Sequence, residues 1–154
     1  NDVIDICKVT GNIEIDGKTY NYLFWHSKMD ANLLLTDNSG FLFSSDTILS
    51  FLENSLSQMG LNSKESSDFI TYWYPRMSLN EKNYIHFLFN EACNNYAELN
   101  ITPKPNQVFR VGMVWSKTNS NVVPLPQKIE KLNRTGFTVI EWGGTELPAL
   151  LNLN

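Results

Sequence analysis

The sequence is poor in the residues that most often carry chemistry. It contains two cysteines, Cys7 and Cys93, and two histidines, His26 and His86. The cysteines form no C-x-x-C pair and are not at metal-ligand spacing to the histidines, so we expect no metal site. Phosphate loops, dinucleotide fingerprints and nucleophile elbows are missing from the sequence. We therefore expect no cofactor, assign no catalytic residue, and interpret each histidine as a structural residue.

Charged residues are scarce as well. They make up 18% of the chain, with a net charge of −4, against roughly 25% in typical soluble domains. An acidic chain without basic runs binds nucleic-acid backbones poorly, so we expect no nucleic-acid partner. No apolar run approaches the roughly 18 residues of a membrane-spanning helix, and we expect no transmembrane segment. The length predicts one domain over 1–154, with a core over about 12–147 and a flexible C-terminal tail.

The two cysteines leave two alternatives open. In an oxidising compartment, Cys7 and Cys93 could form a disulfide that closes a long loop, which is worth roughly 4 kcal/mol in the chain-entropy model. In a reducing compartment they would be two small buried apolar side chains. The sequence does not decide between these alternatives.

Alternation of apolar and polar residues predicts two β-hairpins near the N-terminus, over 12–28 and 33–43. The first hairpin turns at Asp16-Gly17, because both central positions of a type I′ turn favour residues that tolerate positive φ. Its return strand, over 18–25, is rich in aromatic residues that alternate on one face. The second hairpin turns at 37–40.

The apolar period then changes to that of a helix, and residues 45–75 are predicted to form a helical hairpin. Gly60 suits the left-handed position that ends the first helix. Asn62, with Glu65 three residues later, resembles a capping box at the start of the second helix. We expect that helix to end before Pro75, because proline has no N–H to donate within a helix.

The strand period returns in the second half of the chain. It predicts strands over 84–89, 97–102, 107–116 and 136–142, with an irregular crossing or edge segment over 117–134. The segment 107–116 is apolar on both faces, as expected of a central strand. The chain is therefore predicted to be α+β, with an antiparallel or mixed β-sheet, or a sandwich, that carries the helical hairpin as an insertion.

Two charged residues lie where this pattern predicts burial. Arg110 shares a face with Val108 and Val114 of its strand, and Glu141 shares a face with Phe137 and Val139 of the last strand. Because an unpaired buried charge is very costly, our hypothesis is that Arg110 and Glu141 meet each other or a shared ligand. A purely structural ion pair, or side chains that reach solvent from strand ends, are the alternatives.

Aromatic residues, 12% of the chain, are the other potential binding resource. Most are expected to fill the core, but Trp25 and Tyr74 lie at the ends of predicted elements, where we expect them to face solvent. Together with Arg110, Glu141 and Trp142, they are the candidate residues for binding a protein or glycan partner.

Several strings in this order resemble an uncharacterised family of bacterial proteins. They are YNYLFW at 20–25, FITYWYPRM at 69–77, segments within 96–111, and RTGFTVIEWGG at 134–144. Members occur commonly in gut Firmicutes, and many have apparent secretion signals. The resemblance covers roughly residues 15–145 and implies an extracellular or cell-envelope location. It carries over no catalytic residue, but it marks Arg110, Glu141 and Trp142 as pattern residues.

These observations favour a non-enzymatic, exported or surface-associated binding domain. One alternative is a hydrolase with a cleft near Glu141 and Arg110. Another is a structural or assembly module that acts through strand edges.

Overall fold

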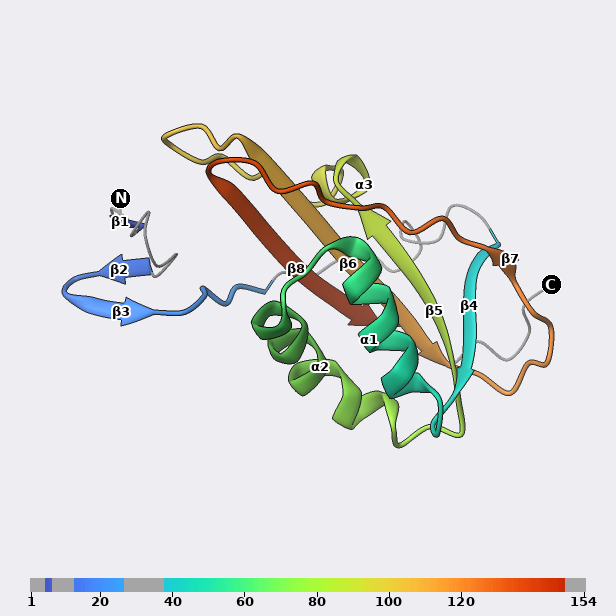
Figure 1. Cartoon of the computed structure of the whole chain (residues 1–154). Helices are drawn as coiled ribbons and strands as arrows, with labels where there is room; N and C mark the ends of the chain where they lie inside the picture. The colour runs from blue at the N-terminus through green and yellow to red at the C-terminus, as the bar shows by residue number, and fades with distance from the viewer. Residues whose placement is uncertain (1–4, 7–12, 27–37, 149–154) are drawn as a thin grey trace.

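The main body of the protein is a five-stranded mixed β-sheet with a helical pair on one face (Figure 1). The computed structural model describes residues 5–6, 13–26 and 38–148. The sheet has the order β7-β4-β5-β6-β8, formed by β4 (Ser39–Ser44), β5 (Lys82–Phe89), β6 (Gln107–Lys117), β7 (Leu125–Pro126) and β8 (Thr138–Glu146). The β4–β5 and β5–β6 pairs are antiparallel, whereas β4–β7 and β6–β8 are parallel. The predicted α+β class with a mixed sheet is confirmed.

The helical hairpin is inserted between two neighbouring strands, β4 and β5, as predicted. Helix α1 (Ile48–Met59) ends at Gly60, which adopts φ 86°. Helix α2 (Ser63–Met77) begins at Asn62, whose side chain accepts from the Glu65 N–H at 3.0 Å, while the Glu65 carboxylate accepts from the Asn62 N–H at 2.8 Å. The predicted glycine terminus and capping box are both confirmed, because both depend on residues a few positions apart.

The prediction that the second helix ends before Pro75 is wrong. Helix α2 passes through Pro75 and ends at Met77. Met77 is completely buried, and Trp73, one turn earlier, is 5% exposed. Burying these two side chains against the sheet offsets the single hydrogen bond that Pro75 cannot donate.

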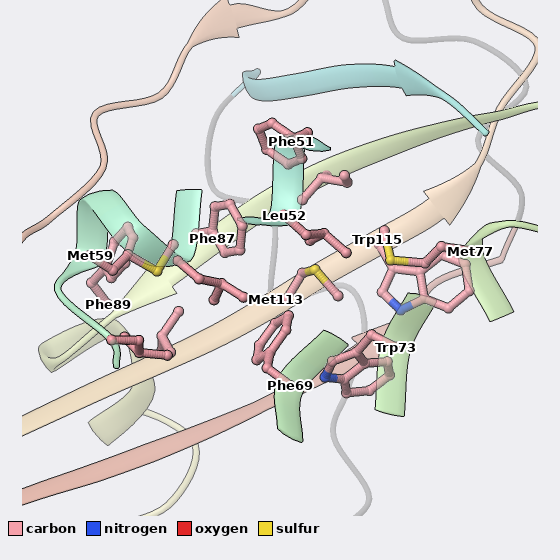
Figure 2. Packing of buried hydrophobic residues seen from close by; sticks show 14 of the residues in the cluster. Phe51, Leu52, Met59, Phe69, Trp73, Met77, Phe87, Phe89, Met113 and Trp115 are labelled. Atoms are coloured by element: carbon pink, nitrogen blue, oxygen red, sulfur yellow. The ribbon is translucent and has the colours of Figure 1, made fainter. Parts of the chain in front are cut away.

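The core lies between the helical pair and the sheet. Phe87 on β5 and Met113 on β6 are register partners that point into it, and Trp115 lies two residues further along β6. Side chains of Leu52 on α1 and Phe69 on α2 pack over them (Figure 2). Each of these five side chains is 1% exposed or less, so this layer is the main source of hydrophobic stabilisation.

The opposite face of the sheet carries helix α3 (Glu91–Asn94), a single turn too short to show a helical period in the sequence. A smaller apolar cluster lies there, formed by Leu88, Cys93, Val114 and Leu147. The strand predicted over 97–102 is wrong, since these residues have no strand pairing. The Ala97 carbonyl instead accepts a hydrogen bond of 2.6 Å from the Arg110 guanidinium, so this segment is bound to the sheet by a side chain.

A second, three-stranded antiparallel sheet lies apart from the five-stranded sheet (Figure 1). It consists of β1 (Asp5–Ile6), β2 (Ile13–Ile15) and β3 (Lys18–Tyr20). The turn between β2 and β3 has φ 49° at Asp16 and 73° at Gly17, as the Asp-Gly prediction requires.

The first hairpin is shorter than predicted, since its return strand ends at Tyr20 and residues 21–26 form no strand. In the second predicted hairpin, the first arm lies outside the described residues. Its second arm corresponds to β4, whose partners in the described sheet are β5 and β7. The predicted flexible tail begins at the end of the described residues, and residues 149–154 lie outside them.

The connection from β6 to β8 is the irregular segment that the sequence predicts. Its first part includes β7, which pairs with β4, and the segment then runs along the helical side of the sheet, as Figure 1 shows. There the Leu132 N–H donates to the Met59 carbonyl at 2.9 Å, and Arg134 forms an ion pair with Glu65. We call residues 118–137 the crossover. Among the described residues, no helix has both the length and the apolar character needed to span a bilayer.

Candidate functional site

Arg110 and Glu141 meet across the two parallel strands β6 and β8. They are register partners, and the Arg110 Nε–H donates to Glu141 Oε2 in an ion pair. The Arg110 side chain is 4% exposed and that of Glu141 is 18% exposed. The predicted meeting of these two charges is confirmed, and the pairing supplies the partner that a buried charge requires.

The remaining contacts of Arg110 hold α3 and the loop after it to the sheet. Its Nη1 donates to Asn94 Oδ1 at 2.7 Å and to the Ala97 carbonyl at 2.6 Å. The Arg110 main chain pairs with Asn90, which donates its N–H to the Arg110 carbonyl and accepts from the Arg110 N–H through Oδ1. One atom of the ion pair, Glu141 Oε1, is buried without a hydrogen-bond partner among the described residues. One ion pair and several hydrogen bonds of Arg110 therefore connect β6, β8 and α3.

Cys93 on α3 is the thiol that the described residues place close to this network. It is free within the described part of the chain, and its S–H donates to the Leu88 carbonyl at 3.5 Å. Burial raises the pKa of the Cys93 thiol to about 11, with smaller opposing effects from Arg110 and Glu141. Cys93 is thus protonated at neutral pH and is a poor nucleophile. Cys7 lies outside the described residues, so the two alternatives for Cys7 and Cys93, a disulfide or two separate thiols, both stay open.

The two histidines lie away from the Arg110–Glu141 pair. His86 is 4% exposed on β5 and lies opposite Val114 of β6. Since Val114 is four residues from Arg110 on the same strand, His86 is about 13 Å from it along the sheet. His26 is exposed, and its ring stacks against Phe24 with centroids 6.5 Å apart. Within the described ranges, no three acidic, histidine or cysteine residues are grouped as metal ligands would be.

A group of partly exposed aromatic rings gathers where α2 approaches β8. We call it the aromatic surface and define it as Tyr22, Phe24, Trp25, Tyr72 and Trp142. Phe24 is 68% exposed, Tyr22 52%, Trp25 51% and Tyr72 37%, while Trp142 is half-buried. The rings come from residues 21–26, from α2 and from β8, which are far apart in sequence. Figure 1 shows residues 21–26 reaching the outer side of β8.

Ring contacts connect four members of the aromatic surface, Tyr22, Phe24, Tyr72 and Trp142, to one another and to the core. Tyr22 and Tyr72 each contact Trp142, with centroids 6.3 and 6.1 Å apart, and Phe24 contacts Tyr72 at 6.2 Å. Trp142 in turn contacts Phe69 of the core at 5.3 Å. The three contacts within the surface have interplanar angles of 49°, 41° and 59°, so the rings form an uneven surface and not a flat platform.

Two cations lie over these rings. Lys64 lies 5.9 Å from the Tyr22 ring centroid and also pairs with Asp68. The Arg76 guanidinium lies 4.9 Å from the Tyr72 centroid and 5.7 Å from that of Trp73. Among the described residues Arg76 forms no ion pair, so its charge is available to a partner.

The candidate binding residues thus fall into separate places. Trp25 faces solvent, as expected, and Trp142 lies at the base of the aromatic surface. The expectation that Tyr74 faces solvent is wrong, because Tyr74 is partly buried and packs against the core. The exposure of Tyr22 and Phe24 was missed, because a strand over 18–25 would have placed these residues on a packed face. The alternation of aromatic residues along 20–24 was the sequence signal that singled out these two side chains.

Comparison of the chain with protein-family models, with curated proteins and with solved structures finds no match.

Proposed function

We propose that the chain is a non-enzymatic interaction domain that binds a protein partner through the aromatic surface. The observation that carries the proposal is the exposure of Phe24, Tyr22 and Tyr72 in one group of ring contacts with Trp142, with the exposed Trp25 next to Phe24 in the chain. Clustered, solvent-exposed aromatic side chains are typical of interaction sites, because each ring buries a large apolar area when it is covered.

A protein partner agrees with this geometry better than a glycan does. Stacking on a sugar favours an open ring face that lies parallel to the pyranose, whereas these rings are tilted against one another by 41–59°. An uneven apolar surface with an arginine at its rim favours apolar side chains that insert between the rings. Arg76 adds a preference for an acidic group beside them. The proposed partner is a protein segment that carries apolar and acidic residues together.

The proposal also includes an exported or surface-associated location, which the family resemblance supports. Detection of the natural full-length product in the medium or envelope fraction of its cell tests this part separately. Recovery in the cytosolic fraction alone would contradict it.

A displayed random-peptide library, selected on the immobilised protein, tests the binding surface. We expect enrichment of peptides that combine aromatic or aliphatic residues with Asp or Glu. Synthetic versions should bind Phe24→Ser and Tyr72→Ser at least tenfold more weakly than the unchanged protein, since both positions contribute apolar area at the centre of the surface. Arg76→Glu should select against the acidic residues.

Leu79→Ser is the matched control, because Leu79 is 84% exposed just beyond α2 and has no part in the aromatic surface. It should leave peptide binding unchanged. Equal binding by the Phe24→Ser and Leu79→Ser variants would overturn the proposed surface. Binding on a glycan array that is lost in Phe24→Ser would replace the protein partner with a sugar.

A further inference from the structure

A second feature, independent of the aromatic surface, concerns how the crossover is held to the sheet. Residues 125–130 lie between two surface cavities of about 350 Å³ each. Gln127 and Lys128 line one cavity together with His86. Ile129 lines the other, whose floor includes Phe41 and Phe51. Beyond the pairing of β7 with β4 and the packing of Ile129 against the core, side-chain hydrogen bonds hold this part of the crossover to the sheet.

The side chain of Gln127 makes the central contact. The Phe87 N–H donates to Gln127 Oε1 at 2.8 Å, and Gln127 Nε2 donates back to the Phe87 carbonyl at 2.5 Å. The pairing of β4 with β5 ends at Phe41 and Ile85. Beyond that pair, the Gln127 side-chain amide therefore takes the place of a strand backbone and pairs with Phe87. These two bonds also fix the orientation of the amide, because rotating it would set two donors and two acceptors against each other.

This fixed amide determines which form of His86 fits. Gln127 Nε2 lies 3.4 Å from His86 Nε2 and can only donate, so His86 Nε2 must accept. At the other side of the ring, His86 Nδ1 lies 2.9 Å from the Ser39 carbonyl and must donate to it. Only the neutral ring with its proton on Nδ1 satisfies both contacts.

We propose that His86 and Gln127 form an acid-sensitive latch, in which a second proton on His86 Nε2 releases residues 127–130 of the crossover from the sheet. The added N–H would face the Gln127 amide N–H, so the hydrogen bond between the two side chains is lost and two donors oppose each other. Moving Gln127 away breaks both of its bonds to Phe87. Release of the crossover then uncovers the aromatic floor beneath Ile129.

Within the described part of the chain, no carboxylate forms an ion pair with His86. Lys128 and Glu130, on the crossover, share the cavity with His86. Lys128 carries the same charge as the protonated ring, and Glu130 accepts a hydrogen bond of 2.8 Å from Asn90. On β5, the Tyr84 hydroxyl donates to the Ser39 carbonyl. Ser39 on β4, Val114 on β6 and Ala92 on α3 bring no charge to the ring.

Amide hydrogen exchange of the full chain, followed by NMR between pH 7.5 and 5.0, tests the latch. The reporter is the Phe87 amide, whose partner is the Gln127 side chain. After correction for the intrinsic pH dependence of exchange, we expect its protection to fall about three- to tenfold, as for the loss of one hydrogen bond. Ring ¹⁵N shifts at pH 7.5 should report a neutral His86 protonated on Nδ1.

His86→Asn keeps a donor near the Ser39 carbonyl but cannot gain a proton, so it should abolish the pH effect. His26→Asn is the matched control, because His26 is the other histidine of the chain and lies on its exposed surface; it should keep the effect. Phe87 protection that does not change with pH, or that changes equally in both variants, would overturn the latch. So would a ring protonated on Nε2 at pH 7.5, which can be observed even if His86→Asn fails to fold.

Discussion

Removal of the Arg110 side chain tests whether the charge pair between β6 and β8 supports the fold. Arg110→Met keeps a long apolar side chain but leaves the Glu141 carboxylate without its cation. Because Arg110 is 4% and Glu141 18% exposed, water can only partly replace the lost partner. Breaking such a buried pair costs about 3–5 kcal/mol. That loss is a large part of the roughly 5–15 kcal/mol that stabilises a typical domain.

Urea unfolding, followed by tryptophan fluorescence, measures the change in free energy of unfolding. Arg110→Met should also lower the thermal midpoint by about 6–20 °C, given roughly 2–4 °C per kcal/mol for a chain of this size. Glu141→Gln should cost a similar amount, about 3 kcal/mol, because the amide oxygen can still accept from Arg110 Nε but leaves the buried Arg110 charge without a counter-charge.

The double variant separates pairing from individual effects. If the two side chains act as a pair, the cost in the double variant is smaller than the sum of the single costs by about 1 kcal/mol or more. Arg134→Met provides a matched control, because Arg134 is 38% exposed in its ion pair with Glu65 and should cost about 1 kcal/mol or less. Single effects of Arg110→Met and Glu141→Gln that add within about 0.3 kcal/mol would refute the reasoning.

Three further substitutions and one reaction follow from local geometry. A Cβ on Gly144 would lie 2.4 Å from a main-chain oxygen of β6, whereas one on Gly143 meets nothing within 4 Å. Gly144→Ala should therefore lower the unfolding free energy by about 2 kcal/mol or more, and Gly143→Ala should be nearly neutral. Equal effects of the two substitutions would contradict the close approach at Gly144. Pro75→Ala restores an N–H inside α2 and should raise the unfolding free energy by about 1 kcal/mol; a lower thermal midpoint would argue against this. Burial raises the pKa of Cys93 to about 11, so iodoacetamide at pH 8 should modify this thiol at least about tenfold more slowly in the folded than in the unfolded chain. Peptide mapping after reduction can measure the two rates. Equal rates would contradict the burial of Cys93.

Local signals in the sequence predicted the elements whose causes are local. The Asp16-Gly17 turn, Gly60 at the end of α1, and Asn62 with Glu65 at the start of α2 each depend on residues next to one another. The strand periods of β5, β6 and β8 were equally clear, because their alternate residues are buried in one core.

The errors occurred where distant contacts decide the structure. Pro75 lies inside α2 because Met77 is anchored in the core. Residues 97–102 are bound by the Arg110 side chain and have no neighbouring strand to pair with. Residues 21–25 have the composition of a strand, but a strand also needs a partner, and no composition supplies one.

The candidate site was predicted only in part, for the same reason. The pairing of Arg110 with Glu141 could be inferred, because two charges on apolar faces require partners. The aromatic surface could not, since Tyr22, Tyr72 and Trp142 come together only after β8 has joined β6 in parallel and α2 has docked over both.

The crossover has a consequence for the order in which the chain folds. The Leu132 N–H donates to the Met59 carbonyl at the end of α1, which connects the crossover to the helical hairpin. We therefore expect β8 to join the sheet late, after β4, β5 and β6 have assembled around the helices. Truncation of Ile140 on β8 should then mainly accelerate unfolding, whereas truncation of Met113 on β6 should also slow folding. Folding and unfolding rates of the two variants can distinguish this order from simultaneous assembly.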